Sequence, residues 1–354
     1  MKCAKLILLV LLVNIKYLEA QTNYTFGDSS GTGGVSGSGY TVLDQKVTFT
    51  NGTTKNLATT NLIISLTNQQ YGNATSHPFE GMTSATYSGG VAFGAAGGAI
   101  GSNTIPAAFN RYANLNFFGS PHNNFFTINK LASPGTGIKV DSIKSLTIGL
   151  FTDGLIKTDG HNINGIGDLN TDIYFADITL KFNEPVSNPV IHLGGLGGTS
   201  DYFFSSSNKK SWLGYTTVFE LLDAYTITRL SGSTKFDADI ATKKISDTTI
   251  WLGFQSSAAQ CYGGKLTWGA SGSFSVNAVN IKRLNFRIYL RSDAGRITYA
   301  ASENASPSCD SIVINEAFTT QEYPRWSSTE QVRADGFTLS VSFARVKIMG
   351  NVFN

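Results

Sequence analysis

The amino-acid sequence predicts an all-β fold, in the form of a β-sandwich or jelly roll of antiparallel sheets with long loops and little helix. Short segments of alternating apolar and polar residues carry this prediction, because a period of two places the apolar side chains on one face of a strand. Glycine, asparagine and proline separate these segments, as expected of turns. Only 14% of the residues are charged, which fits a stable extracellular β protein.

The clearest strands lie in the second half of the chain. Leu284–Leu290 and Phe337–Phe343 each place four apolar side chains on one face. Lys46–Thr50 and Leu62–Leu66 are shorter segments that also predict strands. Val218–Leu230 fits both a helical and a strand period, so its structure is left open.

The stretch Ile173–Ser200 predicts a strand, a tight turn and a second strand that ends in a glycine-rich exit. Ile178–Phe182 alternates between apolar and polar residues, as a half-buried strand does. Pro185 and Pro189 predict the turn, because proline has no N–H group to donate to a neighbouring strand. Val190–Leu193 then resumes an extended segment.

Residues 1–20 have the features of a secretory signal peptide. Lys2 and Lys5 precede the apolar segment Leu6–Val13, and Ala20 supplies a small residue before the expected cleavage. The apolar segment is too short to span a bilayer as a helix, although an uncleaved anchor is the alternative. We therefore expect a secreted chain with a single β-sandwich domain over residues 21–345 and no transmembrane segment.

The net charge argues against a nucleic-acid partner. The whole chain carries +3, and the signal peptide holds three lysines and one glutamate, so the mature chain carries +1. Nucleic-acid binding rests on clustered basic residues, and only isolated lysine pairs occur.

Cys261 and Cys309 are the two cysteines that remain after the signal peptide is removed. An even number of cysteines in an oxidising compartment predicts a disulfide. A loop of roughly fifty residues would stabilise the fold by about 3–4 kcal/mol. Two separately buried thiols are the alternative.

The polar segment Asp153–Asp172 is the candidate metal site. Carboxylate and amide oxygens are hard ligands of the kind that calcium takes. Gly165 is placed as in a calcium loop, but Gly160 occupies the position of the first acidic ligand. An ordinary hydrated loop, in which Asn, Asp and Gly supply turn conformations, is the favoured interpretation, so no cofactor is expected and calcium is the alternative. The candidate calcium ligands are Asp159, Asn162, Asn164, Asp168 and Asp172.

Aromatic residues near predicted loops are the candidate ligand-binding groups. Exposed tryptophan and tyrosine rings stack against sugar rings while their polar edges form hydrogen bonds. The segment Tyr202–Tyr215 predicts an exposed aromatic loop, although many bulky aromatic residues are buried in cores. The candidate ligand-binding residues are Tyr202, Trp212 and Tyr215.

No residue is assigned a catalytic role. The histidines lack metal-binding spacing, no G-x-S-x-G motif occurs, and His192 alternates with apolar neighbours in a strand. A glycosidase needs two carboxylates that face each other across a cleft. Asp177, Glu184 and Glu220 are candidates, but the sequence does not pair them. We therefore expect a non-enzymatic protein.

The end of the chain resembles the first strand of small repeat modules in bacterial surface adhesins. Val346–Asn354 (VKIMGNVFN) is similar to the I-x-G-x-V-F-x-D motif that often opens collagen-adhesin B-type and serine-aspartate-repeat B-type modules. Phe182–Gly198 and Gly336–Phe343 are similar to the β-rich N-terminal regions of large secreted surface proteins. Residues 346–354 are thus the start of a following module or, alternatively, the last strand of the main sheet.

The resemblance implies a secreted, cell-surface adhesin-like or structural-interaction domain. Its partner would be a protein or glycan on a host or neighbouring cell, recognised by loops on a β scaffold. The first alternative is a lectin-like carbohydrate-binding module, assisted by calcium. The second alternative is a secreted glycan-acting enzyme.

Overall fold

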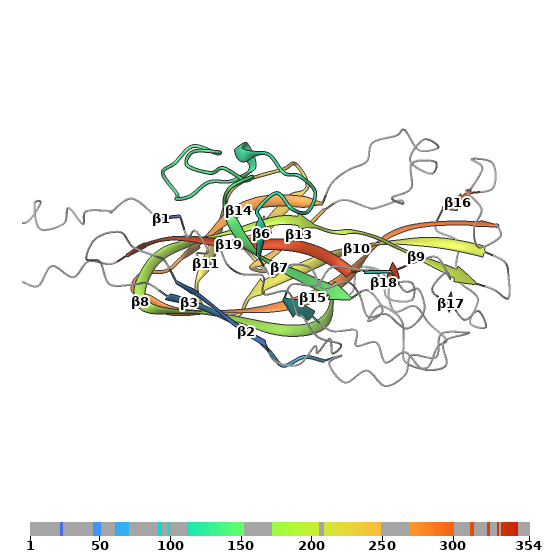
Figure 1. The fold of residues 1–354 in the computed structure, drawn as a ribbon, viewed down its shortest axis with the longest axis horizontal. Coiled ribbons are helices and arrows are strands. Elements are labelled where there is room, and N and C mark those ends of the chain that lie inside the picture. The colour runs from blue at the N-terminus through green and yellow to red at the C-terminus, as the bar shows by residue number, and fades with distance from the viewer. Residues whose placement is uncertain are drawn as a thin grey trace, which may run out of the picture.

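The computed structural model describes residues 22–23, 45–50, 61–70, 91–93, 98–99, 112–151, 172–204, 209–248, 269–300, 312–314, 324–325, 331–332 and 334–345. Within these residues the only helix is one short 3-10 turn, η1 (Asn123–Phe125), and the fold is all-β as predicted (Figure 1). The strands are β1 (Thr22–Asn23), β2 (Gln45–Thr50), β3 (Asn61–Thr67), β4 (Val91–Phe93), β5 (Gly98–Ala99), β6 (Tyr112–Asn114), β7 (Lys144–Phe151), β8 (Asp172–Leu196), β9 (Gly198–Phe204), β10 (Lys209–Leu221), β11 (Thr226–Gly232), β12 (Phe236–Asp239), β13 (Lys244–Asp247), β14 (Ala270–Asn277), β15 (Ile281–Ala300), β16 (Ile312–Ile314), β17 (Pro324–Arg325), β18 (Gln331–Val332) and β19 (Ala334–Arg345).

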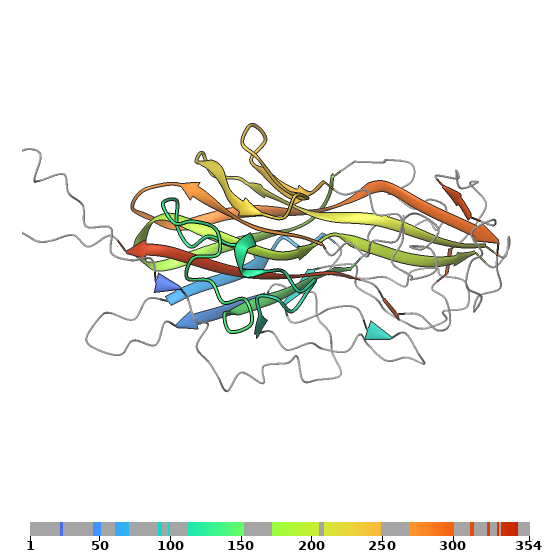
Figure 2. The same ribbon diagram turned by 90° about the horizontal axis from the view of Figure 1, so that it is seen from above.

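Seventeen of these strands form one antiparallel hydrogen-bonded sheet that curls into two layers (Figure 2). The first layer has the order β12–β13–β10–β15–β8–β3–β2. The second layer has the order β11–β14–β8–β19–β7, and β4 and β6 both pair with the far side of β7. β8 belongs to both layers and therefore joins them. Beyond the layers, β9 and β16 extend β10 and β15 toward the right-hand end of Figure 1.

The predicted tight turn in Ile173–Ser200 is wrong, because β8 runs through it as one long bent strand. The first half of β8 pairs with β3 and β15, whereas its second half pairs with β14 and β19. The two halves therefore lie in different layers, with the proline-flanked stretch at the bend between them (Figure 1). Pro185 and Pro189 lie where the hydrogen-bonded register is interrupted, so their missing N–H groups cost little.

A second crossing between the layers packs against the bend of β8. The short connection from β14 to β15 leaves the second layer and enters the first. The Asn188 N–H donates to the Ala278 carbonyl at 2.7 Å, and the Asn280 N–H donates to the Ser187 hydroxyl at 3.1 Å. Asn188 and Asn280 have φ of 45° and 59°, a left-handed conformation that asparagine tolerates better than most residues. The two layers are thus fastened at one end of the molecule.

One hydrophobic core fills the space between the layers. The alternating residues of β15 and β19 predicted to face inward are buried in it. Edge-to-face aromatic contacts connect the layers: Phe219 of β10 lies 5.3 Å from Phe337 of β19, and Phe182 of β8 lies 5.2 Å from Phe343 of β19, between ring centroids. Val218–Leu230, which the sequence left open, forms the end of β10, a short turn and β11. Pairing of β10 with β15 and of β11 with β14 therefore decides the structure of this segment.

Residues 115–143 form a cover segment over the outer face of the second layer. The segment leaves at β6 and returns at β7, and the Leu115 N–H donates to the Ile143 carbonyl at 2.8 Å. It has a small apolar cluster of its own, which consists of Leu115, Phe126, Ile138, Val140 and Ile143.

The glycine-rich exit of β8 makes room for the cover segment. A Cβ atom at Gly195 would lie 2.7 Å from Phe118 Cβ, and one at Gly336 would lie 2.6 Å from the Phe118 ring. Gly195 also has φ of +88°, which disfavours other residues. Phe118 therefore sits against the sheet only because both positions are glycine.

Several predictions concern residues outside the described ranges. Cys261 and Cys309 belong here, as do the signal peptide and residues 346–354.

β1 and β19 pair with each other, so the first and last described strands lie side by side. Among the described residues, no helix is long and apolar enough to cross a membrane.

Candidate functional site

The outer face of the first layer carries a row of alternating charges, which we call the charge ladder: Lys244, Glu220, Arg287 and Asp177. Strand register places these residues side by side on β13, β10, β15 and β8. Their neighbours in sequence point inward to the core, so the period of two that builds the core also builds this row. Opposite charges on adjacent strands stabilise a sheet modestly.

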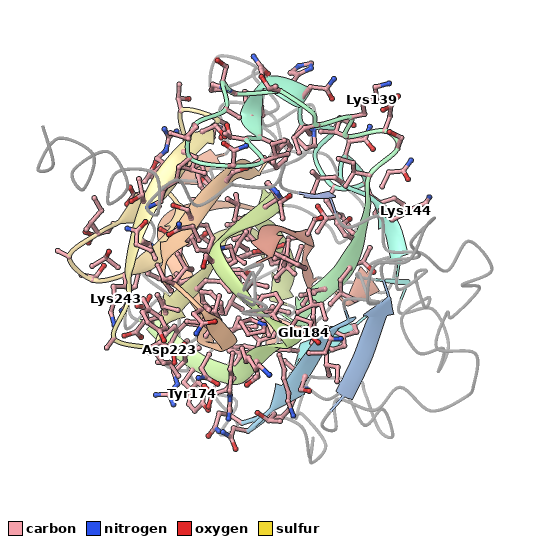
Figure 3. The ribbon with its side chains drawn as sticks, turned by 90° about the vertical axis from the view of Figure 1, so that its left-hand side faces the viewer. Lys139, Lys144, Tyr174, Glu184, Asp223 and Lys243 are labelled. Carbon is pink, nitrogen blue, oxygen red and sulfur yellow. The ribbon has the colours of Figure 1, made fainter. Side chains whose placement is uncertain are left out.

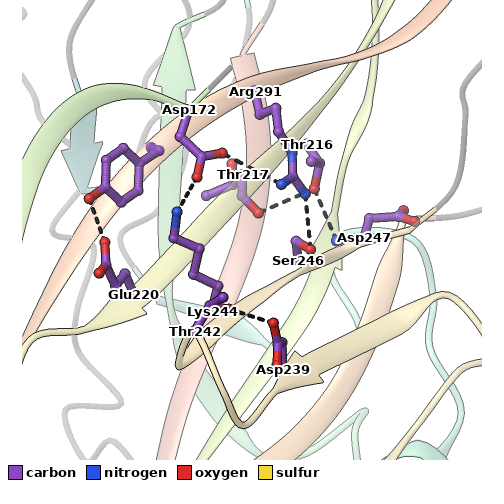
Figure 4. A network of polar contacts seen from close by, with 11 residues as sticks. Asp172, Thr216, Thr217, Glu220, Asp239, Thr242, Lys244, Ser246, Asp247 and Arg291 are labelled. Carbon is purple, nitrogen blue, oxygen red and sulfur yellow. Dashed lines mark hydrogen bonds and ion pairs between the residues drawn. The ribbon is translucent and has the colours of Figure 1, made fainter. Parts of the chain in front are cut away.

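Hydrogen bonds hold the ladder residues in place. Arg287 Nε donates to Asp177 Oδ1 at 2.9 Å, and Asn68 Nδ2 donates to Asp177 Oδ2 at 2.8 Å. Lys244 Nζ reaches Asp172 Oδ2 at 2.5 Å, with Arg291 Nη1 at 3.6 Å from the other oxygen of Asp172. Figure 4 shows Lys244 and Arg291 converging on Asp172. Lys244, Arg287 and Arg291 thus balance the charges of Asp172, Asp177 and Glu220, while Lys181 and Arg283 lie farther along the same face.

Two tyrosines stand in the middle of this face. Tyr174 and Tyr289 are cross-strand partners, and their ring centroids lie 6.2 Å apart. The Arg287 guanidinium lies 4.3 Å from the Tyr174 centroid, and Lys244 Nζ lies 5.2 Å from the Tyr289 centroid. Such contacts between a cation and a ring contribute about 0.5–1 kcal/mol at exposed sites. The rings are therefore held in fixed positions while remaining partly exposed.

The local environment shifts the pKa of the two tyrosines and of Asp177 on this face. Partial burial raises the pKa of Tyr289 to about 12, and its hydrogen bond to Glu220 adds to the effect. Partial burial also raises the pKa of Tyr174. Burial acts to raise the pKa of Asp177, but hydrogen bonds from Arg287 and Asn68 outweigh it, so the pKa is lowered. The tyrosines stay neutral and the carboxylate stays ionised at neutral pH.

Of the candidate calcium ligands, only Asp172 lies within the described residues. It stands at the start of β8 and is paired with Lys244 and Arg291. Two cations at one carboxylate reduce its attraction for a metal ion. Asp159, Asn162, Asn164 and Asp168 lie outside the described ranges. In the part of the chain that the structure describes, no group of three or more metal-ligating side chains occurs.

The prediction of an exposed aromatic loop at Tyr202–Tyr215 is wrong, because β9 and β10 form an antiparallel pair there. Tyr215 is only 4% exposed and belongs to the core. Its burial removes it from the candidate ligand-binding residues. In the backbone register Tyr202 lies opposite Ser211, and Trp212 lies opposite Asp201, so Tyr202 and Trp212 are not cross-strand partners.

The three candidate carboxylates of the glycosidase alternative do not face one another. Asp177 and Glu220 lie on either side of Arg287 in the charge ladder, on a sheet face. Arg287 binds the first, and the Tyr289 hydroxyl donates to the second at 2.5 Å. Glu184 is exposed at the bend of β8. A glycosidase pair across a cleft requires a different arrangement.

His192 is a structural residue of the second layer. Its Nδ1 lies 2.7 Å from Ser273 Oγ, and its Nε2 lies 2.8 Å from Ser342 Oγ. A serine beside a histidine resembles a nucleophile and its base, but both residues are at most 1% exposed beneath the cover segment. Burial lowers the pKa of His192 to about 3, so the ring is neutral.

Asp335 is a buried carboxylate that no sequence motif predicts. Its oxygens accept hydrogen bonds from the Gly197 N–H at 3.0 Å, the Thr217 N–H at 3.0 Å and the Thr217 hydroxyl at 2.5 Å. Burial raises its pKa to about 7 despite these donors. Asp335 lies two residues before Phe337, the first inward-facing residue of the alternating segment Phe337–Phe343. This spacing places Asp335 on the inward face of the strand, and it is the one feature of the sequence that indicates its burial.

Comparison with known proteins adds no relative. No family model matches the chain, and no curated protein or solved structure matches it.

Proposed function

We propose that this protein is a secreted, cell-surface adhesin-like domain that recognises a protein or glycan without catalysing a reaction. The observation that carries the proposal is the tyrosine pair Tyr174–Tyr289, which stands among paired charges on a rigid sheet face. Partly exposed aromatic rings flanked by charged and polar groups are suited to anchor a protein partner or to stack against a sugar ring.

The surroundings of the potentially reactive side chains favour recognition over catalysis. The described histidine–serine pair is sealed under the cover segment, and Asp177 and Glu220 are each held by a hydrogen bond. Fixed side chains lose little entropy on binding, which favours affinity. The sequence resemblance to bacterial surface adhesins agrees with this use of a β scaffold.

A lectin is the second candidate, and the tyrosine pair favours it specifically. Neutral sugars bind through the apolar face of the ring and through hydroxyl hydrogen bonds, which the tyrosine rings and the polar side chains around them can provide. Calcium would assist if residues 153–172 hold it.

Arrayed surface proteins and glycans test the proposal. The purified protein should bind at least one arrayed ligand without turning it over, and Tyr174→Ala should weaken that binding at least tenfold, because a central aromatic anchor typically contributes 2 kcal/mol or more, ~30-fold. The matched control is Lys139→Ala, on the opposite side of the molecule from Tyr174, which should leave binding unchanged (Figure 3).

The arms of the experiment separate the alternatives. Binding confined to glycans, and lost with a chelator, would identify a calcium-assisted lectin. Hydrolysis of an arrayed glycan, or the absence of any bound ligand, would contradict the proposal. Unchanged binding of Tyr174→Ala would show that recognition occurs elsewhere and would remove the tyrosine pair as its basis.

A further inference from the structure

The cover segment meets the second layer across a row of polar side chains. Ser231, Ser273, His192 and Ser340 lie in register across β11, β14, β8 and β19. All four are buried, with at most 5% exposure. Buried polar groups require hydrogen-bond partners, because they lose those of water. The hydrogen bonds of each side chain in this row therefore show whether every polar group at the interface has a partner.

The two middle members of the row, Ser273 and His192, have hydrogen-bond partners. The Thr127 N–H of the cover segment donates to Ser273 Oγ at 3.1 Å. Ser273 also bonds His192, whose other nitrogen bonds Ser342. A continuous chain of hydrogen bonds thus runs from β19 through β8 and β14 to the cover segment.

Two hydroxyl groups next to this chain have no partner among the described residues: Thr127 Oγ1 and Ser231 Oγ. Thr127 is 2% exposed and Ser231 is 5% exposed. Both adjoin Ser273, because Thr127 bonds it and Ser231 is its cross-strand partner. Two buried hydroxyls beside the same serine therefore require a partner that the described side chains do not supply.

An internal water molecule is the ligand that fits this chemistry. Internal waters typically make about three hydrogen bonds to buried polar groups that lack other partners. A hydroxyl both donates and accepts, so a water can bond both residues in either orientation. The Phe126 ring packs against His192 beside this site, with centroids 6.1 Å apart.

We propose that Thr127 and Ser231, on either side of Ser273, bind an internal water molecule that joins the cover segment to the second layer. The water extends the hydrogen-bond chain of Ser342, His192 and Ser273 to β11. It stabilises the docking of the cover segment, whose own apolar cluster is separate from the main core.

Hydrogen exchange of the Thr127 amide in the full-length protein tests the proposal. Thr127→Val and Ser231→Ala should each lower the protection factor about fivefold. Each variant removes one partner of the water and leaves the remaining hydroxyl buried without its hydrogen bond. The double variant should lower the protection factor no more than either single variant does, because the same water is lost in all three. Ser275→Ala, on the same strand and face as Ser273, is the matched control and should leave this amide unchanged.

The opposite results would overturn the proposal. If the hydroxyls lack a shared water, removing either one relieves an unpaired group, and the protection factor rises. If they have separate partners, the losses multiply in the double variant. A crystal structure of the unaltered protein supplies a second measurement. It should show a water about 2.7–3.2 Å from both oxygens, and an occupied site that contacts only one would contradict the bridge.

Discussion

Replacing Phe219 with alanine should lower the free energy of unfolding by about 3–5 kcal/mol, the range typical of a fully buried phenylalanine. Phe219 is 2% exposed and contacts Phe286 within its own layer and Phe337 across the core. Its removal leaves a cavity at the junction of the two layers, which neither layer can fill without moving. Urea denaturation followed by circular dichroism measures the loss.

Two further variants calibrate this result. Phe219→Leu keeps most of the volume, so it should cost clearly less than Phe219→Ala. Phe117→Ala removes a ring that is 47% exposed on the cover segment and should cost less than about 1 kcal/mol. A cost for Phe219→Ala no greater than that for Phe117→Ala would contradict the packing of the two layers against one core.

Stability should depend weakly on pH between about 4 and 6.5 because two buried groups have opposite effects there. The pKa of His192 falls from 6.5 to about 3 on folding, so between these values only the unfolded chain binds its proton, and stability rises with pH. The pKa of Asp335 rises from 3.8 to about 7, so between these values only the folded chain keeps its proton, and stability falls as pH rises. Each slope is about 1.4 kcal/mol per pH unit.

Single substitutions should reveal the two slopes separately. In Asp335→Asn the His192 slope remains, so stability should increase with pH from about 3 to 6.5. In His192→Gln the Asp335 slope remains, so stability should decrease from about 4 to 7. Differences between each variant and the unaltered protein, measured by urea denaturation at each pH, cancel the contributions of other groups. Parallel profiles for all three proteins would show that neither group changes its pKa on folding.

The sequence predicts the strands of this protein better than their connections. The alternation in Leu284–Leu290 and Phe337–Phe343 is confirmed, because a period of two sorts residues between core and surface locally. The bend in β8 was not predicted, since Pro185 and Pro189 interrupt pairing equally well in a hairpin and at a corner between layers. Whether a hairpin or a corner forms depends on the pairing of β8 with β14 and β19, two strands that lie far from it in the sequence.

The candidate site was less predictable for the same reason. Asp177 and Glu220 were identified as carboxylates, but only strand register places Arg287 between them. Tyr215 was assigned to an exposed loop because its serine-rich and lysine-containing surroundings resemble one, whereas pairing of β9 with β10 buries it. Thr127 and Ser231 carry no sequence signal, because their environment exists only where the cover segment docks.

The shared strand β8 is the central claim, since it joins both layers and carries Tyr174 on one half and His192 on the other. Nuclear Overhauser effects between backbone amides test it directly. The structure predicts contacts from Val190–Gly194 to β14 and β19, and from Ile178–Phe182 to β3 and β15. Contacts between Ile178–Phe182 and Val190–Leu193 would instead show a hairpin and would contradict the two-layer arrangement.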